Sequence, residues 1–253
     1  EINLSNFVTS TVTNMGNLFN GCNALKSLDL SNFITTSVTN MNGLFKDCKQ
    51  LSSLNLSSFD TSKVNNMGYM FSGCHQISSL DLSNFVTSKV TTMDKMFQSC
   101  NKLISLDLAN FDTSLVASMN NMFGGCGNLE YLDLSNFQTS KLKSMSYMFK
   151  DCKKITSINL SSFNTSSVNN MECIFYGCNI LPSVNISTFD TSSATKLNGL
   201  FYACKALTSI DLSNFNTSKC ENMGHMFYQC TSLVSLDLSS FDTYNTLWMD
   251  NIS

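Results

Sequence analysis

Hydrophobic residues recur along this chain with a period of 26 residues. Each period contains the spacing L-x-x-L-x-L, as in Leu25, Leu28 and Leu30, followed by further hydrophobic residues at wider intervals. Leu28 and Leu30 alternate with polar Ser27 and Asp29, which is typical of a short strand with one buried face. We therefore predict a strand in each period, with the leucines inward and the Ser and Asp side chains outward.

The second half of each period changes its spacing. In the first copy the hydrophobic residues are Val12, Met15, Leu18, Phe19 and Cys22, which are three or four positions apart. That spacing favours one face of a short helix. Thr and Ser residues before it are suitable N-caps, and a glycine follows in several copies, where helices commonly end. Each period therefore predicts a strand, a turn, a short helix and a second turn.

A unit of this size cannot bury its own hydrophobic side, but stacked units share a continuous core. The L-x-x-L-x-L strand motif is typical of leucine-rich repeats. We predict an α/β fold: a leucine-rich-repeat solenoid of about ten 26-residue strand–turn–short-helix units with one parallel β-sheet face. Residues 1–253 would form a single solenoid. The chain begins and ends inside a unit, so we expect it to be a fragment of a longer protein.

Composition excludes some functional classes. The formal net charge is −3 and all 15 basic residues are lysines. A nucleic-acid-binding protein would be expected to have a basic excess and arginines, so nucleic acid is not a predicted partner. No run of 18 hydrophobic residues occurs, so we predict no membrane span in this fragment.

Two stretches resemble a known family in detail. Residues 54–74 read LNLSSFDTSKVNNMGYMFSGC and residues 210–230 read IDLSNFNTSKCENMGHMFYQC. Both are similar to the motif LDLSNFDTSKVxNMxxMFxGC of the BspA-like leucine-rich-repeat proteins, which are bacterial surface proteins and include mycoplasma lipoproteins. The resemblance extends over the whole chain. It implies an extracellular, cell-surface location with the anchor outside this fragment, a role in adhesion to host or neighbouring cells, and no shared catalytic residues or cofactors.

Cysteines recur at one position of the repeat. Nine of the eleven share it: Cys22, Cys48, Cys74, Cys100, Cys126, Cys152, Cys178, Cys204 and Cys230. Zinc sites need clustered pairs such as C-x-x-C, which are absent from the sequence, and like-oriented side chains in a parallel stack rarely have disulfide geometry. We predict buried, reduced thiols and no metal site at this position. Cys173 falls at an outward helix position and is a candidate reactive thiol.

A row of Asp and Asn residues is predicted to line the outer strand face: Asn3, Asp29, Asn55, Asp81, Asp107, Asp133, Asn159, Asn185, Asp211 and Asp237. Asp81, Asp107 and Asp133 are consecutive, and carboxylates ~5 Å apart repel by roughly 0.8 kcal/mol in water. Three interpretations remain open: a solvated strand face, a binding site for a cationic or hydroxyl-rich partner, or a Ca²⁺ site.

The predicted function is non-enzymatic. His75 and His225 are almost six repeats apart, and no nucleophile motif accompanies the many serines. The leading hypothesis is a cell-surface binding and adhesion module that presents a rigid polar strand face to a protein or glycan. The predicted binding residues are Asp81, Asp107 and Asp133, with Ser79, Ser105 and Tyr131 beside them; Tyr131 is the one aromatic residue at its repeat position. The alternative is a structural stalk, or a fibre or lattice component that stacks head to tail with itself through uncapped repeat ends.

Overall fold

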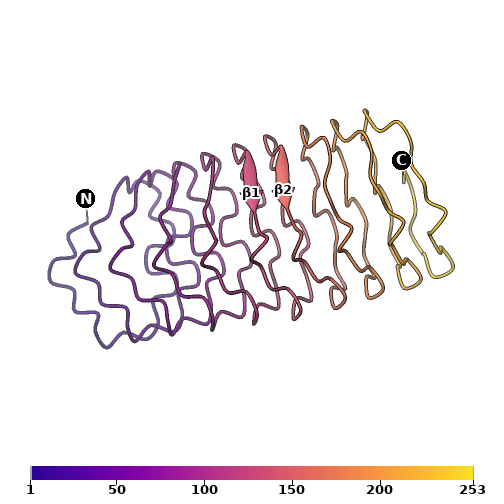
Figure 1. Ribbon diagram of the computed structural model, residues 1–253. Coiled ribbons are helices and arrows are strands. Elements are labelled where there is room, and N and C mark those ends of the chain that lie inside the picture. Colours follow the sequence, from indigo (N-terminus) through magenta and orange to yellow (C-terminus); the bar gives the residue numbers. More distant parts are fainter. Residues whose placement is uncertain (1, 253) are drawn as a thin grey trace.

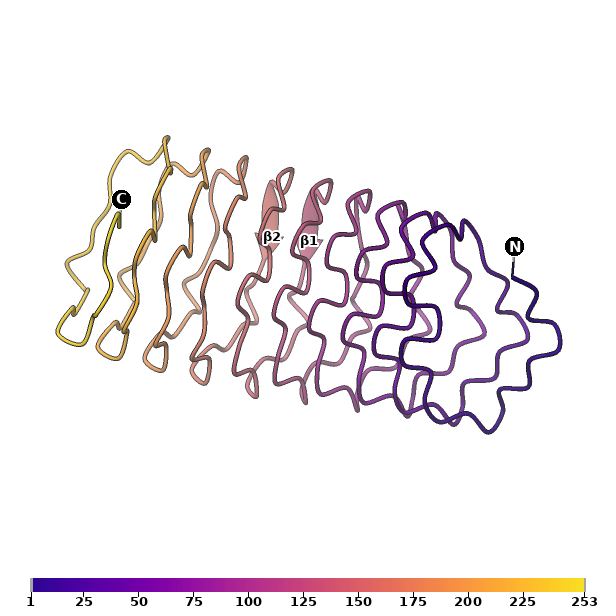
Figure 2. The ribbon, with the colours of Figure 1, turned by 180° about the vertical axis from the view of Figure 1, so that it is seen from behind.

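The computed structural model describes residues 2–252 as an elongated stack of similar coils (Figure 1). Successive coils lie side by side in chain order, and the view from behind shows the same order (Figure 2). Equivalent residues of neighbouring coils are 26 positions apart and contact one another directly. The predicted leucine-rich-repeat solenoid is therefore present, although its units differ in detail from the predicted ones.

Regular strand pairing is limited to two adjacent coils. β1 (Tyr131–Asp133) and β2 (Ser157–Asn159) are parallel, with Tyr131 opposite Ser157 and Asp133 opposite Asn159. Other coils of residues 2–252 repeat the inward leucines and outward polar residues without forming further named strands. The extended stretch is short because a turn follows it directly, as where the Phe33 N–H bonds to the Leu30 carbonyl at 2.9 Å. The predicted sheet face is thus an extended face with only one regular strand pair.

The predicted short helix is wrong, because residues 2–252 contain no helix. Turns occupy this segment instead. The N–H of Met96 bonds to the Met93 carbonyl at 3.2 Å, and that of Cys100 to the Phe97 carbonyl at 3.1 Å. The third residue of each turn has a positive φ, 56° at Lys95 and 58° at Ser99. A positive φ at this one position defines a type II turn and interrupts an α-helix.

Hydrogen bonds between coils explain why turns replace the helix. The N–H groups of Lys95, Phe97 and Ser99 donate to carbonyl oxygens of the next coil at 2.8, 2.9 and 2.7 Å. In a helix these groups would bond four residues back within the same segment. An isolated helix of two turns is marginal in water, whereas a stack of like coils supplies a partner for each group. Isolated parallel bridges consequently run along this side from Asn14↔Asn40 to Asn222↔Trp248.

Ladders of like side chains fill the core. One Phe ladder has ring centroids 5.3–5.8 Å apart between neighbouring coils. Its members are Phe19, Phe45, Phe71, Phe97, Phe123, Phe149, Phe175, Phe201 and Phe227. Leucines and methionines of the same coils are buried beside them. Burial of such surface is the main term that stabilises a solenoid.

Polar side chains, among them the buried Thr61, tie the coils together at the turn that follows the extended face. Thr61 Oγ1 donates to the Val86 carbonyl at 3.0 Å and accepts the Val86 N–H at 2.8 Å. Asn110 Nδ2 donates to the carbonyls of Leu82 and Phe85 at 3.0 and 2.8 Å. The Thr residues at this position were expected as helix caps, but they satisfy the backbone of the neighbouring coil instead.

The recurring cysteines are free thiols and, apart from the half-buried Cys22 and Cys230, are buried, as predicted. Cys100 Sγ, for example, contacts the Phe71 carbonyl oxygen at 3.3 Å. Cys173 corrects the sequence-based expectation, because it too is buried. Cys173 has a positive φ of 54°, and its Sγ lies 3.6 Å from the Asn198 carbonyl oxygen. Burial raises the pKa of the Cys173 thiol to about 12, so it is not an activated nucleophile.

Candidate functional site

The predicted binding residues lie on the extended face. Asp81, Asp107 and Asp133 occupy the same position in three consecutive coils and all three are exposed. Tyr131 and Asp133 flank the buried Leu132 within β1, and Tyr131 is 50% exposed. An aromatic ring that is half exposed on a rigid strand is available for contact with a partner.

Two shallow depressions bring most of these residues together. One has a volume of about 320 Å³ and is lined by Ser105, Asp107 and Tyr131 together with Asp133. Its neighbour, of about 180 Å³, is lined by Asp81 and again by Asp107. Ser79 is exposed but lines neither depression. The centre of this face is therefore Asp107, which belongs to both hollows.

Ala109 separates the two depressions and lines both. All the remaining copies of the repeat have a serine at this position. In the preceding coil that serine, Ser83, places its hydroxyl 2.7 Å from Asp81 Oδ1. Asp107 has no such neighbour and accepts only the Ala109 N–H at 3.0 Å. The small Ala109 side chain thus leaves space beside Asp107. The Asp107 carboxylate keeps more of its hydrogen-bonding capacity than the Asp81 carboxylate does.

The whole Asp/Asn row has a structural role that the sequence-based reasoning missed. Each member, from Asn3 to Asp237, accepts the backbone N–H of the residue two positions later at 2.9–3.2 Å. These contacts are Asx turns, which Asp and Asn form equally well. The signal was present in the sequence, because Asp and Asn exchange freely at this position. The turns use Oδ1; within residues 2–252, the Oδ2 atoms of Asp81 and Asp107 accept no hydrogen bond.

Hydrogen bonds lower the pKa of two carboxylates of this face, those of Asp81 and Asp133. The hydroxyl and the N–H of Ser83 lower the pKa of Asp81, and the N–H and hydroxyl of Ser135 lower that of Asp133. No lysine neutralises the row: within residues 2–252 the one ion pair joins His225 to Asp250 at 3.2 Å. The face consequently presents three consecutive, uncompensated negative charges at neutral pH.

Neither a metal centre nor a catalytic centre is evident in the described part of the chain. Residues 2–252 contain no group of three or more His, Cys, Asp or Glu side chains arranged to hold a metal ion. His75 Nδ1 lies 2.9 Å from the Ser99 carbonyl and 2.7 Å from Asn101 Oδ1, while His225 pairs with Asp250 in a distant coil. The two histidines are therefore engaged in separate structural contacts.

A tyrosine ladder on the turn side was not predicted. The rings of Tyr176 and Tyr202 stack with centroids 4.4 Å apart, and Tyr228 continues the row at 5.2 Å. Lys150 Nζ lies 5.0 Å from the centroid of Tyr176 and caps the ladder. The sequence could have predicted this ladder, because tyrosine occupies the same repeat position in three consecutive copies. The rings cover one another, and all three tyrosines are half-buried.

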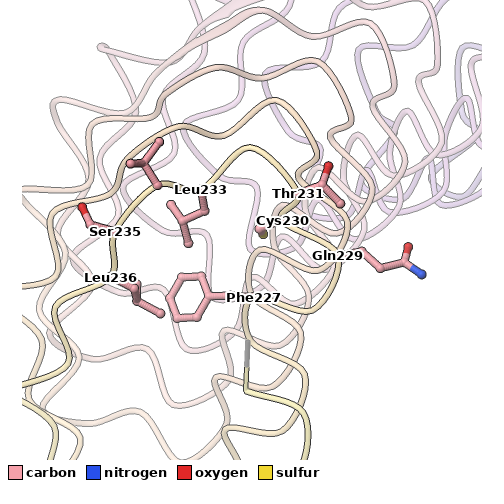
Figure 3. Close-up of a pocket in the computed structure, with 8 residues that line it drawn as sticks. Phe227, Gln229, Cys230, Thr231, Leu233, Ser235 and Leu236 are labelled. Carbon is pink, nitrogen blue, oxygen red and sulfur yellow. The ribbon is translucent and has the colours of Figure 1, made fainter.

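A hydrophobic hollow lies in the last coils and is drawn in Figure 3. It has a volume of about 380 Å³ and is lined chiefly by Phe227, Cys230, Leu233 and Leu236. Residues equivalent to these pack against the next coil throughout the stack. The hollow is accordingly a continuation of the core and not a separate ligand site. Residues 2–252 also contain no helix with the length and hydrophobicity that crossing a membrane requires.

The family is established by a family model that matches nearly the whole chain, over residues 1–105, 70–179 and 155–252. The chain belongs to the DUF285 family, described as Mycoplasma proteins of unknown function. The match confirms the identification of a BspA-like leucine-rich-repeat protein made from its motifs. No curated protein matches the chain.

Several solved structures are similar at low sequence identity. A leucine-rich repeat protein from Bacteroides ovatus is 20% identical with a TM-score of 0.44; the match covers 88% of this chain and 63% of that one. The Treponema pallidum leucine-rich repeat protein is 16% identical with a TM-score of 0.40, covering 78% and 72%. A leucine-rich cell surface protein from Faecalibacterium prausnitzii is 16% identical with a TM-score of 0.38, covering 89% and 77%. The chain thus spans less than two thirds of the length of the Bacteroides protein.

Proposed function

We propose that this chain is a non-enzymatic binding module of a bacterial cell-surface protein and that it mediates adhesion through its extended face. The observation that supports this proposal is the clustering of departures from the repeat. Ala109 and Tyr131 each replace a serine, in adjacent coils, and they lie where Asp81, Asp107 and Asp133 follow one another. In a chain of near-identical units, such local departures favour a specific site over a uniform surface.

The chemistry of the face favours a protein partner with lysine or arginine side chains. Tyr131 supplies a rigid, half-exposed ring, and aromatic residues of this kind are enriched among the residues that dominate binding energy. The cationic group of a partner would meet the carboxylates of Asp107 and Asp133 beside that ring. Because the coils hold these side chains in place, little conformational entropy is lost on binding.

The test compares two triple variants that differ only in their place along the same row. The first carries Asp81→Asn, Asp107→Asn and Asp133→Asn. The control carries Asp29→Asn, Asp211→Asn and Asp237→Asn. Asn preserves the Asx turn, as Asn55 and Asn185 do at the same position, so both variants are expected to fold. Both also change the net charge by the same amount.

Wild type and variants are screened against extracellular-matrix proteins, glycans and whole cells. We expect the wild type and the control to bind a protein with basic segments, and the first variant to lose at least tenfold in affinity. Equal binding by all three would reject the face as the site. Binding to glycans alone would replace the protein partner with a carbohydrate.

A further inference from the structure

Lysines recur at one turn of the stack, the turn that leads into the extended stretch. A backbone hydrogen bond closes this turn in every coil, as where the Leu103 N–H bonds to the Cys100 carbonyl at 3.1 Å. Five lysines occupy the two central positions of the turn, and all five are exposed: Lys49, Lys102, Lys153, Lys154 and Lys205. We name the turns that carry them, together with the turns between, the lysine row: residues 48–51, 74–77, 100–103, 126–129, 152–155, 178–181 and 204–207.

The lysines of this row lie in every second coil. Successive coils lie side by side in chain order (Figure 1), and equivalent residues are 26 positions apart. Parallel extended segments are spaced by about 4.8 Å, so consecutive lysine-bearing turns are about 10 Å apart and the row is about 30 Å long. The three intervening turns contain no aspartate or glutamate. The row is therefore a narrow line of positive charges that runs along the stack.

Carboxylates of the chain leave these charges largely uncompensated. None of the five lysines forms an ion pair with a carboxylate in residues 2–252. The acidic residues next to the row are Asp47 and Asp151, each one position before its turn, and both are half-buried. One position after the turns, Lys26 and Glu130 offset each other. Five lysines against two aspartates leave a net positive edge on a chain whose net charge is −3.

The shape and chemistry of the lysine row match an extended anionic chain rich in hydroxyl groups. Lysine ammonium groups are compact charges that bind sulfate and carboxylate oxygens. Amide side chains lie between them, at the exposed Gln50 and at the half-buried Gln76 and Asn128, and amides can donate to and accept from hydroxyls. The row contains no Arg, Phe, Tyr or Trp, so nucleic-acid bases would have no such ring to stack on.

We propose that the lysine row binds a linear anionic polysaccharide, which lies along the stack with its sulfate or carboxylate groups at successive lysine-bearing turns. The proposal adds a second binding surface to the one proposed above. It does not depend on that function, because none of the five lysines lines the depressions at Asp107.

The test measures binding of heparin, a sulfated linear polysaccharide, by titration calorimetry at about 0.15 M salt, where charges are screened beyond about 8 Å. The row variant carries Lys102→Gln, Lys153→Asn and Lys154→Gln. The control carries Lys63→Ser, Lys89→Ser and Lys141→Ser, which changes the net charge equally at the turn after the extended face. Every replacement except the Asn already occurs at Gln76 or Ser37, and Asn101 supplies the Asn, so both variants are expected to fold.

The wild type should bind heparin but not neutral dextran, and about 1 M salt should abolish the binding. The row variant should lose at least tenfold in affinity, and the control should stay within about twofold of the wild type. A longer heparin fragment that covers several lysine-bearing turns should bind more tightly than one that reaches a single turn.

A wild type that does not bind heparin would overturn the proposal. An equal loss in the row variant and the control would also overturn it, since overall charge would then explain the binding. Binding to phosphatidylserine vesicles in place of heparin would assign the row to a membrane surface and reject the polysaccharide. The variant with Asp81→Asn, Asp107→Asn and Asp133→Asn should bind heparin at least as tightly as the wild type, which separates this surface from the extended face.

Discussion

Ser83 donates two hydrogen bonds to the same oxygen of Asp81. Its backbone N–H lies 3.0 Å and its hydroxyl 2.7 Å from Asp81 Oδ1. In the neighbouring coil Asn55 accepts the equivalent N–H, from Ser57, also at 3.0 Å. The turn therefore needs an acceptor oxygen at this position but no negative charge.

Substitutions of Asp81 should distinguish the contribution of the turn to stability from that of the negative charge. Asp81→Asn keeps the acceptor and should leave the melting temperature unchanged. Asp81→Ala removes it and should lower the melting temperature by roughly 2–4 °C, because the Ser83 N–H loses its protein partner. Circular dichroism melts of the three proteins test this. Identical melting temperatures would contradict a structural role for the turn.

Acid should destabilise the folded chain through a second set of Asx turns, in which Asp60 and Asp112 accept the N–H groups of Ser62 and Ser114 at 2.9 Å. The hydroxyls of Ser62 and Ser114, and then their N–H groups, lower the folded-state pKa of Asp60 and Asp112 below the unfolded value of about 3.9. A lowered pKa means that the unfolded chain binds more protons, so this stability is present above the unfolded pKa and is lost as pH falls through the folded pKa. Urea unfolding at neutral and acidic pH measures the loss.

The matched variant for this prediction is Asp60→Asn with Asp112→Asn. It keeps both turns but removes both titrations, so its unfolding midpoint should fall less on acidification than that of the wild type. An equal fall would assign the acid sensitivity to other carboxylates.

Alkaline conditions should destabilise the chain through its buried thiols. Burial raises the pKa of Cys126 to about 12, whereas a free thiol has a pKa of about 8.5. A raised pKa gives stability that is complete below the unfolded value and is lost as pH rises toward the folded one. The unfolding midpoint should therefore decline above about pH 8.5. In the native protein thiol labelling should be slow for the nine buried cysteines and faster for the half-buried Cys22 and Cys230, and in denaturant it should be complete for all 11. Rapid native labelling of Cys173 would contradict its burial.

Glycine substitution distinguishes the turns from the helix that the sequence suggested. Ala203 has a φ of 55°, where an alanine side chain is strained. Ala203→Gly should raise the free energy of unfolding by up to about 1 kcal/mol, since glycine avoids the strain. Ala117 is not among the residues with positive φ. Ala117→Gly should therefore lower the free energy of unfolding by roughly 0.5–1 kcal/mol. Chemical denaturation of both variants tests the pair, and a loss of stability in both would favour a helix.

The extended face and core could be predicted from the sequence, but the turns could not. Alternation placed Leu28 and Leu30 inward and Asp29 outward. The leucine side chains are only 8% and 1% exposed, which confirms their inward orientation. Residues three and four apart are buried both in a helix and in successive type II turns, so hydrophobic spacing alone could not distinguish them. Glycine, aspartate and serine at the position of Ser99 were the available signal, because these residues tolerate turns.

The candidate site could be predicted only in part. Repeat alignment selected Tyr131 and the three consecutive aspartates, since both are departures visible in the sequence. The hollows beside Asp107 depend on how neighbouring coils pack around Ala109, which no single repeat reveals. The Asx turns depend on the backbone path after the extended stretch, which the charges of the row do not reveal.

The most direct test of the central claim is hydrogen exchange of the chain with and without the protein selected by the binding screen. If the extended face is the binding surface, amides of residues 105–109 and 131–136 should exchange more slowly in the complex. Residues 172–177 and 198–203 on the turn side should be unchanged. Protection confined to the turn side would contradict the account and move the binding surface to the tyrosine ladder.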